Sequence, residues 1–123
     1  MAKKLSNMAR LEATALALPE AERVNIEAWG DHPTFRVRNK NFVFCDQAAT
    51  HLTVKVPVEE AAALVATRAG AEPAGYGLGR SGWVALELPD PLPDAEWTEI
   101  AELIETSYRL VAPKTLVRKL DSA

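Results

Sequence analysis

Basic and aromatic side chains gather in the middle of this 123-residue sequence, where they could bind an anion and stack on a planar group. From Arg36 to Lys55 there are four basic residues and one acidic residue, Asp46, although the whole chain has a formal net charge of -3. Guanidinium and ammonium groups pair with phosphates or carboxylates, and indole rings offer stacking surfaces. The first candidate ligand-binding residues are therefore Trp29, Arg36, Arg38, Lys55 and Trp83.

A literal G-x-G-x-x-G sequence runs from Gly77 to Gly82. In dinucleotide-binding proteins this pattern follows a strand and opens a helix within a βαβ unit. Here it leads into a strand-like run that begins at Trp83, so we do not expect dinucleotide binding. We expect a flexible turn instead, in which Arg80 and the exposed N–H groups could hold an anion.

The residues that most often bind metals or act as nucleophiles show no recognised spacing. His32, Cys45 and His51 do not form a metal-binding motif, so we expect neither a metal nor a cofactor. Cys45 follows Val43 and Phe44 in an apolar run, which favours a small buried side chain over a nucleophile. No Ser, His and Asp signature is present either, and we assign no catalytic residue and expect no enzyme activity.

The composition, with 48% apolar and 25% charged residues, is typical of one soluble globular domain spanning residues 1–123. The acidic balance argues against a wholly basic nucleic-acid-binding protein but allows a local basic patch. Cys45 is the only cysteine, so an internal disulfide is impossible and we expect a cytoplasmic protein. No run approaches the about 18 uncharged apolar residues that a membrane span needs, and we expect no membrane partner.

Periodicity and turn residues predict an α+β fold in which about five strands form a twisted antiparallel sheet with helices on one face. We expect helices from Ser6 to Leu18, from Pro57 to Gly70, and from Asp94 to the residue before Pro113. The expected strands cover residues 24–29, 34–38, 41–46, 51–56 and 83–88. Residues 115–123 are expected to form a loose tail.

Strand alternation divides the side chains of this sheet between two faces. The side chains expected to face the helices are those of Val24, Ile26, Phe35, Val37, Leu52, Val54, Val56, Val84, Leu86 and Leu88. Those expected to face outward are Trp29, Arg36, Arg38, Thr53, Lys55 and Trp83, with Asn25, Glu27, His51 and Glu87 nearby. The alternative is ordinary: the tryptophans pack over the sheet and the basic side chains are simply solvated.

Several short motifs occur in one order along the chain: Trp29-Gly30, the run from Pro33 to Val37, Lys55-Val56, the run from Gly82 to Val84, the run from Glu102 to Ile104, Ser107-Tyr108 and Pro113-Lys114. With these motifs the chain resembles the MmcQ/YjbR family of small bacterial proteins, from about Ala15 to Lys114. The resemblance implies a CyaY-like, or frataxin-like, fold and DNA binding through a double-wing arrangement. The matching positions, which mark a family surface or framework, are Trp29, Arg36, Lys55, Trp83, Tyr108 and Lys114, and Lys114 thereby joins the candidate ligand-binding residues.

Three function hypotheses follow. The leading one is a non-enzymatic module that binds nucleic acid, with Arg36, Arg38 and Lys55 on phosphates and the tryptophans stacking on bases. The second is a protein that holds a planar or anionic metabolite between the tryptophans and the turn at residues 76–82. The third is a protein-interaction adaptor that uses the sheet. Iron handling of the frataxin type is disfavoured, because Glu12 stands almost alone as an acidic residue in the first helix.

Overall fold

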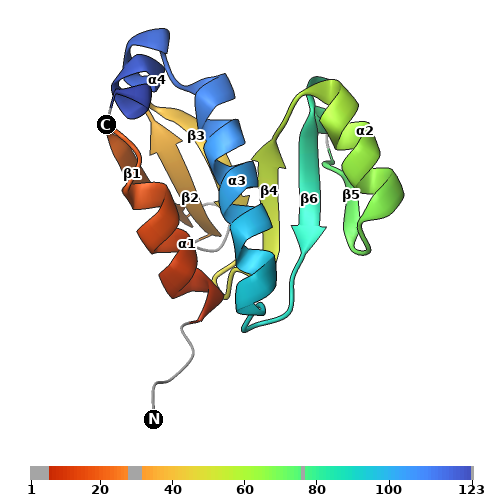
Figure 1. Ribbon diagram of the computed structural model, residues 1–123. Coiled ribbons are helices and arrows are strands. Elements are labelled where there is room, and N and C mark those ends of the chain that lie inside the picture. Colours follow the sequence, from red (N-terminus) through yellow and green to blue (C-terminus); the bar gives the residue numbers. More distant parts are fainter. Residues whose placement is uncertain (1–5, 28–31, 76, 123) are drawn as a thin grey trace.

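The chain folds into a layer of helices on a β-sheet, and the computed structural model describes residues 6–27, 32–75 and 77–122 (Figure 1). In these ranges the helices are α1 (Asn7–Leu16), α2 (Val58–Thr67), α3 (Asp94–Val111) and α4 (Lys114–Asp121), with a 3-10 helix η2 at Leu78–Ser81. The strands are β1 (Ala21–Ile26), β2 (His32–Val37), β3 (Lys40–Cys45), β4 (His51–Lys55), β5 (Ala71–Pro73) and β6 (Trp83–Glu87). The α+β prediction is confirmed, with the short strand β5 in addition to the expected ones.

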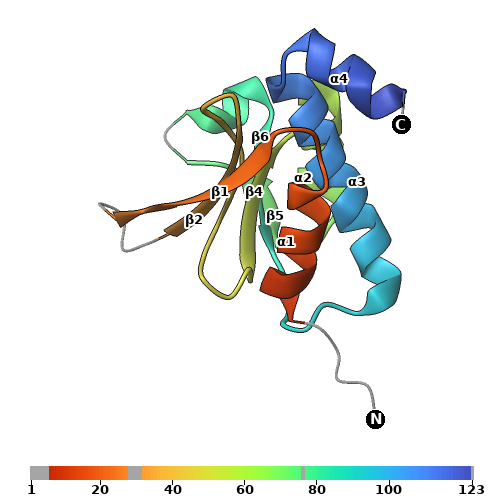
Figure 2. The ribbon, with the colours of Figure 1, turned by 90° about the vertical axis from the view of Figure 1, so that its left-hand side faces the viewer.

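The six strands form one open sheet in the order β1-β2-β3-β4-β6-β5, in which every neighbouring pair is antiparallel. Helix α1 packs on β1, α3 packs on β3 and β4, and α2 packs on β5 and β6. Figure 2 shows α1, α3 and α4 together on one side of the sheet. The opposite side is left without an α-helix among the described residues, so it is the side on which a ligand can reach the strands.

The helices begin where the sequence provides caps or prolines. The hydroxyl of Ser6 accepts the N–H of Ala9, as expected of a helix N-cap. Pro57, Pro93 and Pro113 precede α2, α3 and α4, because proline needs no helical N–H partner at that position. None of the helices in the described ranges combines the length and the hydropathy that crossing a membrane requires.

The core lies between the sheet and α1 and α3. Phe35, Val43 and Val84 from the sheet meet Leu11 and Ile104 from the helices, and all are fully buried. Burying each such side chain contributes about 1.5–3 kcal/mol. Tyr108 in α3 is also fully buried, with its ring edge on Phe42 and its hydroxyl donating to the carbonyl oxygen of Pro19 at 2.7 Å. Tyr108 is therefore part of the framework and not of an exposed surface.

The predicted facing of β1 is wrong. Val24 lies opposite Thr34 and Ile26 lies opposite His32, so both apolar side chains are on the side away from the helices. Arg23 lies opposite the buried Phe35 and forms an ion pair with Glu12 of α1. The guanidinium of Arg23 is satisfied by this ion pair, so only the aliphatic part of its side chain needs to pack on the helix side. Val24 and Ile26 are each only half-buried.

The segment expected to form a loose tail, residues 115–123, is helical as far as Asp121. Residues 114–121 form helix α4, whose Leu116 is buried against the core cluster. Asp121 pairs with Arg109 of α3, with 2.6 Å between the carboxylate oxygen and the guanidinium nitrogen. The apolar residues of this segment, Leu116, Val117 and Leu120, follow the spacing of one helix face, which favours a helix here.

Candidate ligand-binding face of the sheet

The side of the sheet opposite the helices carries a mixture of aromatic, basic and hydroxyl side chains, which we call the open face. The strand register sets one row across it, in which Val24, Thr34, Phe44, Thr53 and Ala85 are successive neighbours on β1, β2, β3, β4 and β6. On one side of this row the register places Glu22, Arg36, Asn41, Lys55 and Trp83. On the other side it places Ile26, His32, His51 and Glu87.

Two aromatic rings meet on the open face. The ring centroids of Phe44 and Trp83 are 5.4 Å apart with an interplanar angle of 66°, an edge-to-face contact. Phe44 comes from β3 and Trp83 from β6, so the pair bridges the intervening strand β4, which contributes Thr53 and Lys55. Both aromatic side chains are half-buried, and they form an apolar platform in the middle of an otherwise polar surface.

The second indole expected beside Trp83 is that of Trp29, which lies outside the described residues. In the described part of the chain, the aromatic ring that contacts Trp83 is that of Phe44. Phe44 lies between the buried Val43 and Cys45 on β3 and so faces the other way, but alternation along the sequence does not reveal this, because Phe42 is fully buried as well.

Arg36 and Lys55 stand beside this platform. Lys55 is directly opposite Trp83 in the register, and Arg36 is opposite Glu22 on one side and Asn41 on the other. The guanidinium Nε of Arg36 donates to the hydroxyl of Thr34 at 3.4 Å. Among the described residues, no ion pair within 4.0 Å involves Arg36, Lys55 or Arg80. These cations therefore keep their charge available for an anionic ligand.

A hydroxyl from the helix layer holds the backbone of Lys55. The β3–β4 ladder ends at the pair Val43 and Val54, and beyond it the two strands separate. Ser107 of α3 fills this gap, accepting the N–H of Lys55 at 2.9 Å and donating to the carbonyl oxygen of Phe42 at 2.6 Å. Helix α3 thereby satisfies two backbone groups that would otherwise lack partners, and it holds the backbone of Lys55 in place at the end of β4.

Arg38 does not join the open face. Strand β2 ends at Val37, and Arg38 lies in the following turn with a φ of 51°. Its guanidinium binds both carboxylate oxygens of Glu20, at 2.6 and 3.0 Å. The hydrogen bond from Arg38 lowers the pKa of Glu20, so the carboxylate stays charged and neutralises the arginine. The strand alternation that grouped Arg38 with Arg36 does not extend into the turn.

The glycine-rich run contains the 3-10 helix η2, which is mostly exposed, and ends at the buried Gly82. Gly77 and Gly82 have φ angles of +77° and +94°, which favour glycine. A Cβ at Gly82 would lie 2.0 Å from the carbonyl oxygen of Val56. The run leads into β6, as expected, and Figure 2 shows it on the side of the sheet away from α1 and α3. The exposed Arg80 therefore lies on the side of the open face, three residues before Trp83 in the sequence.

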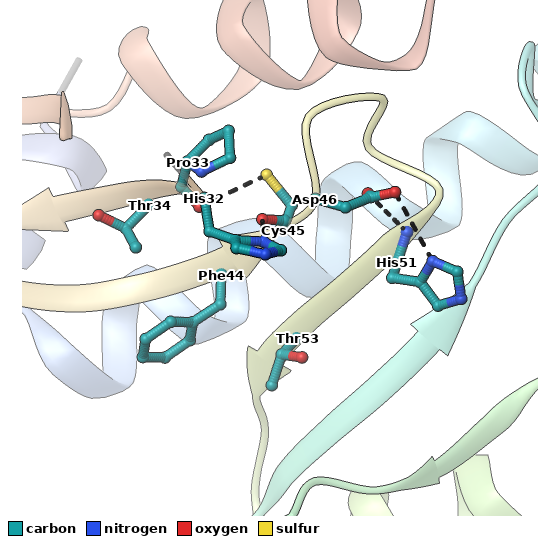
Figure 3. A pocket seen from close by; sticks show the side chains of 8 residues that line it. All are labelled: His32, Pro33, Thr34, Phe44, Cys45, Asp46, His51 and Thr53. Carbon is teal, nitrogen blue, oxygen red and sulfur yellow. Dashed lines mark hydrogen bonds and ion pairs between the residues drawn. The ribbon is translucent and has the colours of Figure 1, made fainter. Parts of the chain in front are cut away.

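A pocket of about 490 Å³ opens at the other end of the open face (Figure 3). It is lined by His32, Pro33, Thr34, Phe44, Cys45, Asp46, His51 and Thr53.

Asp46 shapes one side of this pocket. It accepts hydrogen bonds from the N–H groups of Thr50 and His51, at 2.7 and 3.0 Å, and from the Thr50 hydroxyl at 2.5 Å. Burial alone would raise the pKa of Asp46, but these hydrogen bonds outweigh it and keep the pKa below its ordinary value. The carboxylate is therefore charged, and it lies 3.7 Å from Nδ1 of His51.

Cys45 lines the pocket but is not poised for reaction. Its side chain is 6% exposed and its sulfur lies 3.7 Å from the carbonyl oxygen of Pro33. Burial, with a smaller effect of Asp46, raises the pKa of the Cys45 thiol to about 12. A neutral thiol is a poor nucleophile and a poor metal ligand. Within the described residues, no group of three or more His, Cys, Asp or Glu side chains could hold a metal ion.

Lys114 is exposed at the first residue of α4, on the helix side of the molecule (Figure 2). Of the candidate residues, the fold therefore brings Arg36, Lys55 and Trp83 together on the open face, with Arg80 on the adjoining turn. It separates Arg38 and Lys114 from them. Phe44, Thr53 and the two histidines are the additional open-face residues that could contact a ligand.

Comparison with known proteins places the chain in a family. A search of curated proteins gives no match. A family model described as YjbR matches residues 16–110, a range that contains every strand of the sheet and most of α3. The match covers well over half of the chain, and the protein belongs to the YjbR, or MmcQ/YjbR, family.

Proposed function

We propose that this protein is a non-enzymatic binding module that binds single-stranded nucleic acid on the open face of its sheet. The observation that carries the proposal is the edge-to-face pair of Phe44 and Trp83 beside the cations of Arg36 and Lys55, which form no ion pair with another described residue. Bases stack on exposed aromatic rings with about 1–3 kcal/mol per base, whatever their sequence. Phosphates bind to arginine and lysine that are not already neutralised.

The platform favours a single strand over a duplex. The rings of Phe44 and Trp83 lie within the surface of a sheet, and such rings cannot reach bases that are already stacked and paired inside a helix. In a single strand the bases can turn toward the protein. Residues two apart on a strand are about 6.6 Å apart, so Lys55 lies close enough to the row of Phe44 and Thr53 to meet the phosphate of a base stacked there.

The acidic net charge of the chain is compatible with this proposal because the charges are distributed unevenly. Glu20 and Asp121 neutralise Arg38 and Arg109, which lie away from the platform. In the described ranges Arg36 and Lys55 form no ion pair beside it, although Glu22 lies opposite Arg36 on the edge strand. With only a few phosphate contacts, we expect weak binding with a modest dependence on salt.

Fluorescence anisotropy with a labelled single-stranded oligonucleotide at about 50 mM salt tests the proposal. We expect Arg36→Ala and Lys55→Ala each to weaken binding and to reduce the slope of log affinity against log salt by about 0.7. Arg38→Ala is the matched control, since Arg38 is already paired with Glu20. Undetectable binding by the wild-type protein, or an equal loss in Arg38→Ala, would overturn the proposal.

The pocket beside Phe44 supports a second candidate function, the binding of a small planar metabolite. Its volume of about 490 Å³ falls in the range of pockets that hold small molecules. A thermal-shift screen against cell metabolites tests this candidate, because a ligand that binds the folded state raises the unfolding temperature. A flat response across planar compounds would count against it.

A further inference from the structure

We propose that the pocket between His32 and His51 receives one nucleobase of the bound strand and recognises the hydrogen-bonding edge of that base. This inference rests on the proposed function and adds the part of it that gives sequence preference. The end of the open face that carries Arg36 and Lys55 would then bind a nucleic-acid strand of any sequence, whereas the pocket would distinguish among bases.

The pocket is continuous with the aromatic platform because Phe44 belongs to both. One contact of its ring is with Trp83, and the same side chain lines the pocket. Figure 3 shows Phe44, Thr53, His51 and His32 around the hollow. A strand whose bases stack on Trp83 and Phe44 would bring its next base to this hollow, and the open mouth of the hollow leaves room for the backbone outside.

The hydrogen-bonding groups of the lining divide into those already used and those still available. The hydroxyl of Thr34 donates to the carbonyl oxygen of Val24 at 2.6 Å, and the oxygens of Asp46 accept from Thr50 and His51. By contrast, the hydroxyl of Thr53 has no hydrogen-bond partner among the residues that the structure describes. Thr53 is thus a donor and acceptor that a ligand can use.

The two histidines are each held at one ring nitrogen. Nδ1 of His32 lies 3.4 Å from the carbonyl oxygen of Cys45, and Nδ1 of His51 lies 3.2 Å from the hydroxyl of Thr50. In both rings Nε2 has no such partner in the described part of the chain. The lining therefore offers two imidazole nitrogens and one hydroxyl around an aromatic wall, the combination that recognises the edge and face of a base.

The negative charges around the pocket favour a neutral base over a phosphate as its ligand. The carboxylate of Asp46 lines the pocket, and Glu87 lies directly opposite His51 in the register. These negative charges disfavour a phosphate at this end. The cations of Arg36 and Lys55 lie at the other end of the open face, four residues along the strands, or about 13 Å away. A neutral planar base fits the pocket, and its phosphates fit the basic end.

Affinities for homopolymeric oligonucleotides of about eight nucleotides, with one base type in each, test the inference. For the wild-type protein we expect about a tenfold spread between the strongest and weakest homopolymer, corresponding to the about 1–3 kcal/mol that a good base contact provides. Thr53→Val and His51→Ala should compress this spread to about twofold. Lys55→Ala should weaken binding of all homopolymers equally and leave the spread intact.

Thr98→Val on the exposed surface of α3 is the matched control for Thr53→Val and should change nothing. Thermal unfolding of each variant checks that the fold is retained. Equal wild-type affinity for all homopolymers, or an unchanged spread in both pocket variants, would overturn the inference while leaving strand binding intact.

A second measurement separates the base pocket from strand binding. The chain has two histidines, so the imidazole NMR signals of His32 and His51 report directly on the pocket during a titration with free nucleosides. Shifts that saturate with a nucleoside while no oligonucleotide binds would support a pocket for a free base and would overturn strand binding. The absence of both responses would overturn both proposals.

Discussion

Ser107 on the buried helix α3 accepts a hydrogen bond from the backbone N–H of Lys55 on the open sheet face, at 2.9 Å. The same hydroxyl donates to the carbonyl oxygen of Phe42. Ser107 is fully buried and is one of the few polar side chains in the core. Helix α3 therefore helps to position the end of β4, where Lys55 is proposed to contact a phosphate. A mutation of Ser107 in the core should therefore also change the ligand-binding surface.

Ser107→Ala tests this connection. The substitution leaves the N–H of Lys55 and the carbonyl of Phe42 without their partner, so we expect the free energy of unfolding to fall by about 2 kcal/mol. Urea denaturation followed by circular dichroism measures the change, with the exposed Thr98→Ala on the same helix as a control. An unfolding free energy within about 0.5 kcal/mol of wild type would show that the hydroxyl bridge is dispensable.

Gly82→Ala should disturb the start of β6 and with it Trp83. The added Cβ would lie 2.0 Å from the carbonyl oxygen of Val56, and the φ of +94° is itself unfavourable for alanine. We expect a loss of about 2 kcal/mol or more in stability. Gly75→Ala is the matched control, because nothing lies within 4 Å of a Cβ at Gly75. Equal stability of the two variants in thermal unfolding would contradict the packing at Gly82.

Asn7→Ala should destabilise the end of the molecule where α1 begins. The amide of Asn7 donates to the carbonyl oxygens of Ala49 and Pro89, and its oxygen accepts the N–H of Leu92 at 2.8 Å. Three backbone groups lose their partner, two of them in fully buried contacts, so we expect a cost of about 3 kcal/mol. Chemical denaturation checks this, and the exposed Asn25→Ala should cost less than about 1 kcal/mol.

The thiol of Cys45 should be unreactive in the folded protein. Its pKa is raised from an ordinary value of 9.0 to about 12, so almost no thiolate is present at pH 8. We expect slow labelling by a thiol reagent in buffer and rapid labelling in urea. Because the folded state holds this proton more tightly, its contribution to stability is complete below pH 9 and is lost as the pH rises toward 12. Rapid labelling of the native protein would contradict the burial of Cys45.

The helices and most strands could be predicted from the sequence because their signals are local. The hydroxyl of Ser6, the prolines before three helices and the apolar arc of α3 act within a few residues. The facing of β1 could not be predicted in this way. Val24 and Ile26 fit the pattern of core residues, but the pairing of β1 with β2 places them on the open face and places Arg23 on the helix side, where it pairs with Glu12. Register depends on contacts between distant segments.

The candidate site was predictable only in part, for the same reason. Arg36, Lys55 and Trp83 could be assigned to one face from alternation along single strands. The contact of Phe44 with Trp83 depends on the pairing of β6 with β4, which α2 and β5 separate in the sequence. The pairing of Arg38 with Glu20 depends on how two turns meet. Neither relationship is encoded in a local pattern.

A single NMR experiment tests the central claim, that the open face of the sheet is the surface that binds nucleic acid. Amide spectra of the labelled protein are recorded while an unlabelled single-stranded oligonucleotide is added at about 50 mM salt. We expect the largest shifts at Phe44, Thr53, Lys55 and Trp83, with an indole signal moving as well. Shifts confined to α1, α3 and α4, or no shifts at saturating strand, would contradict it.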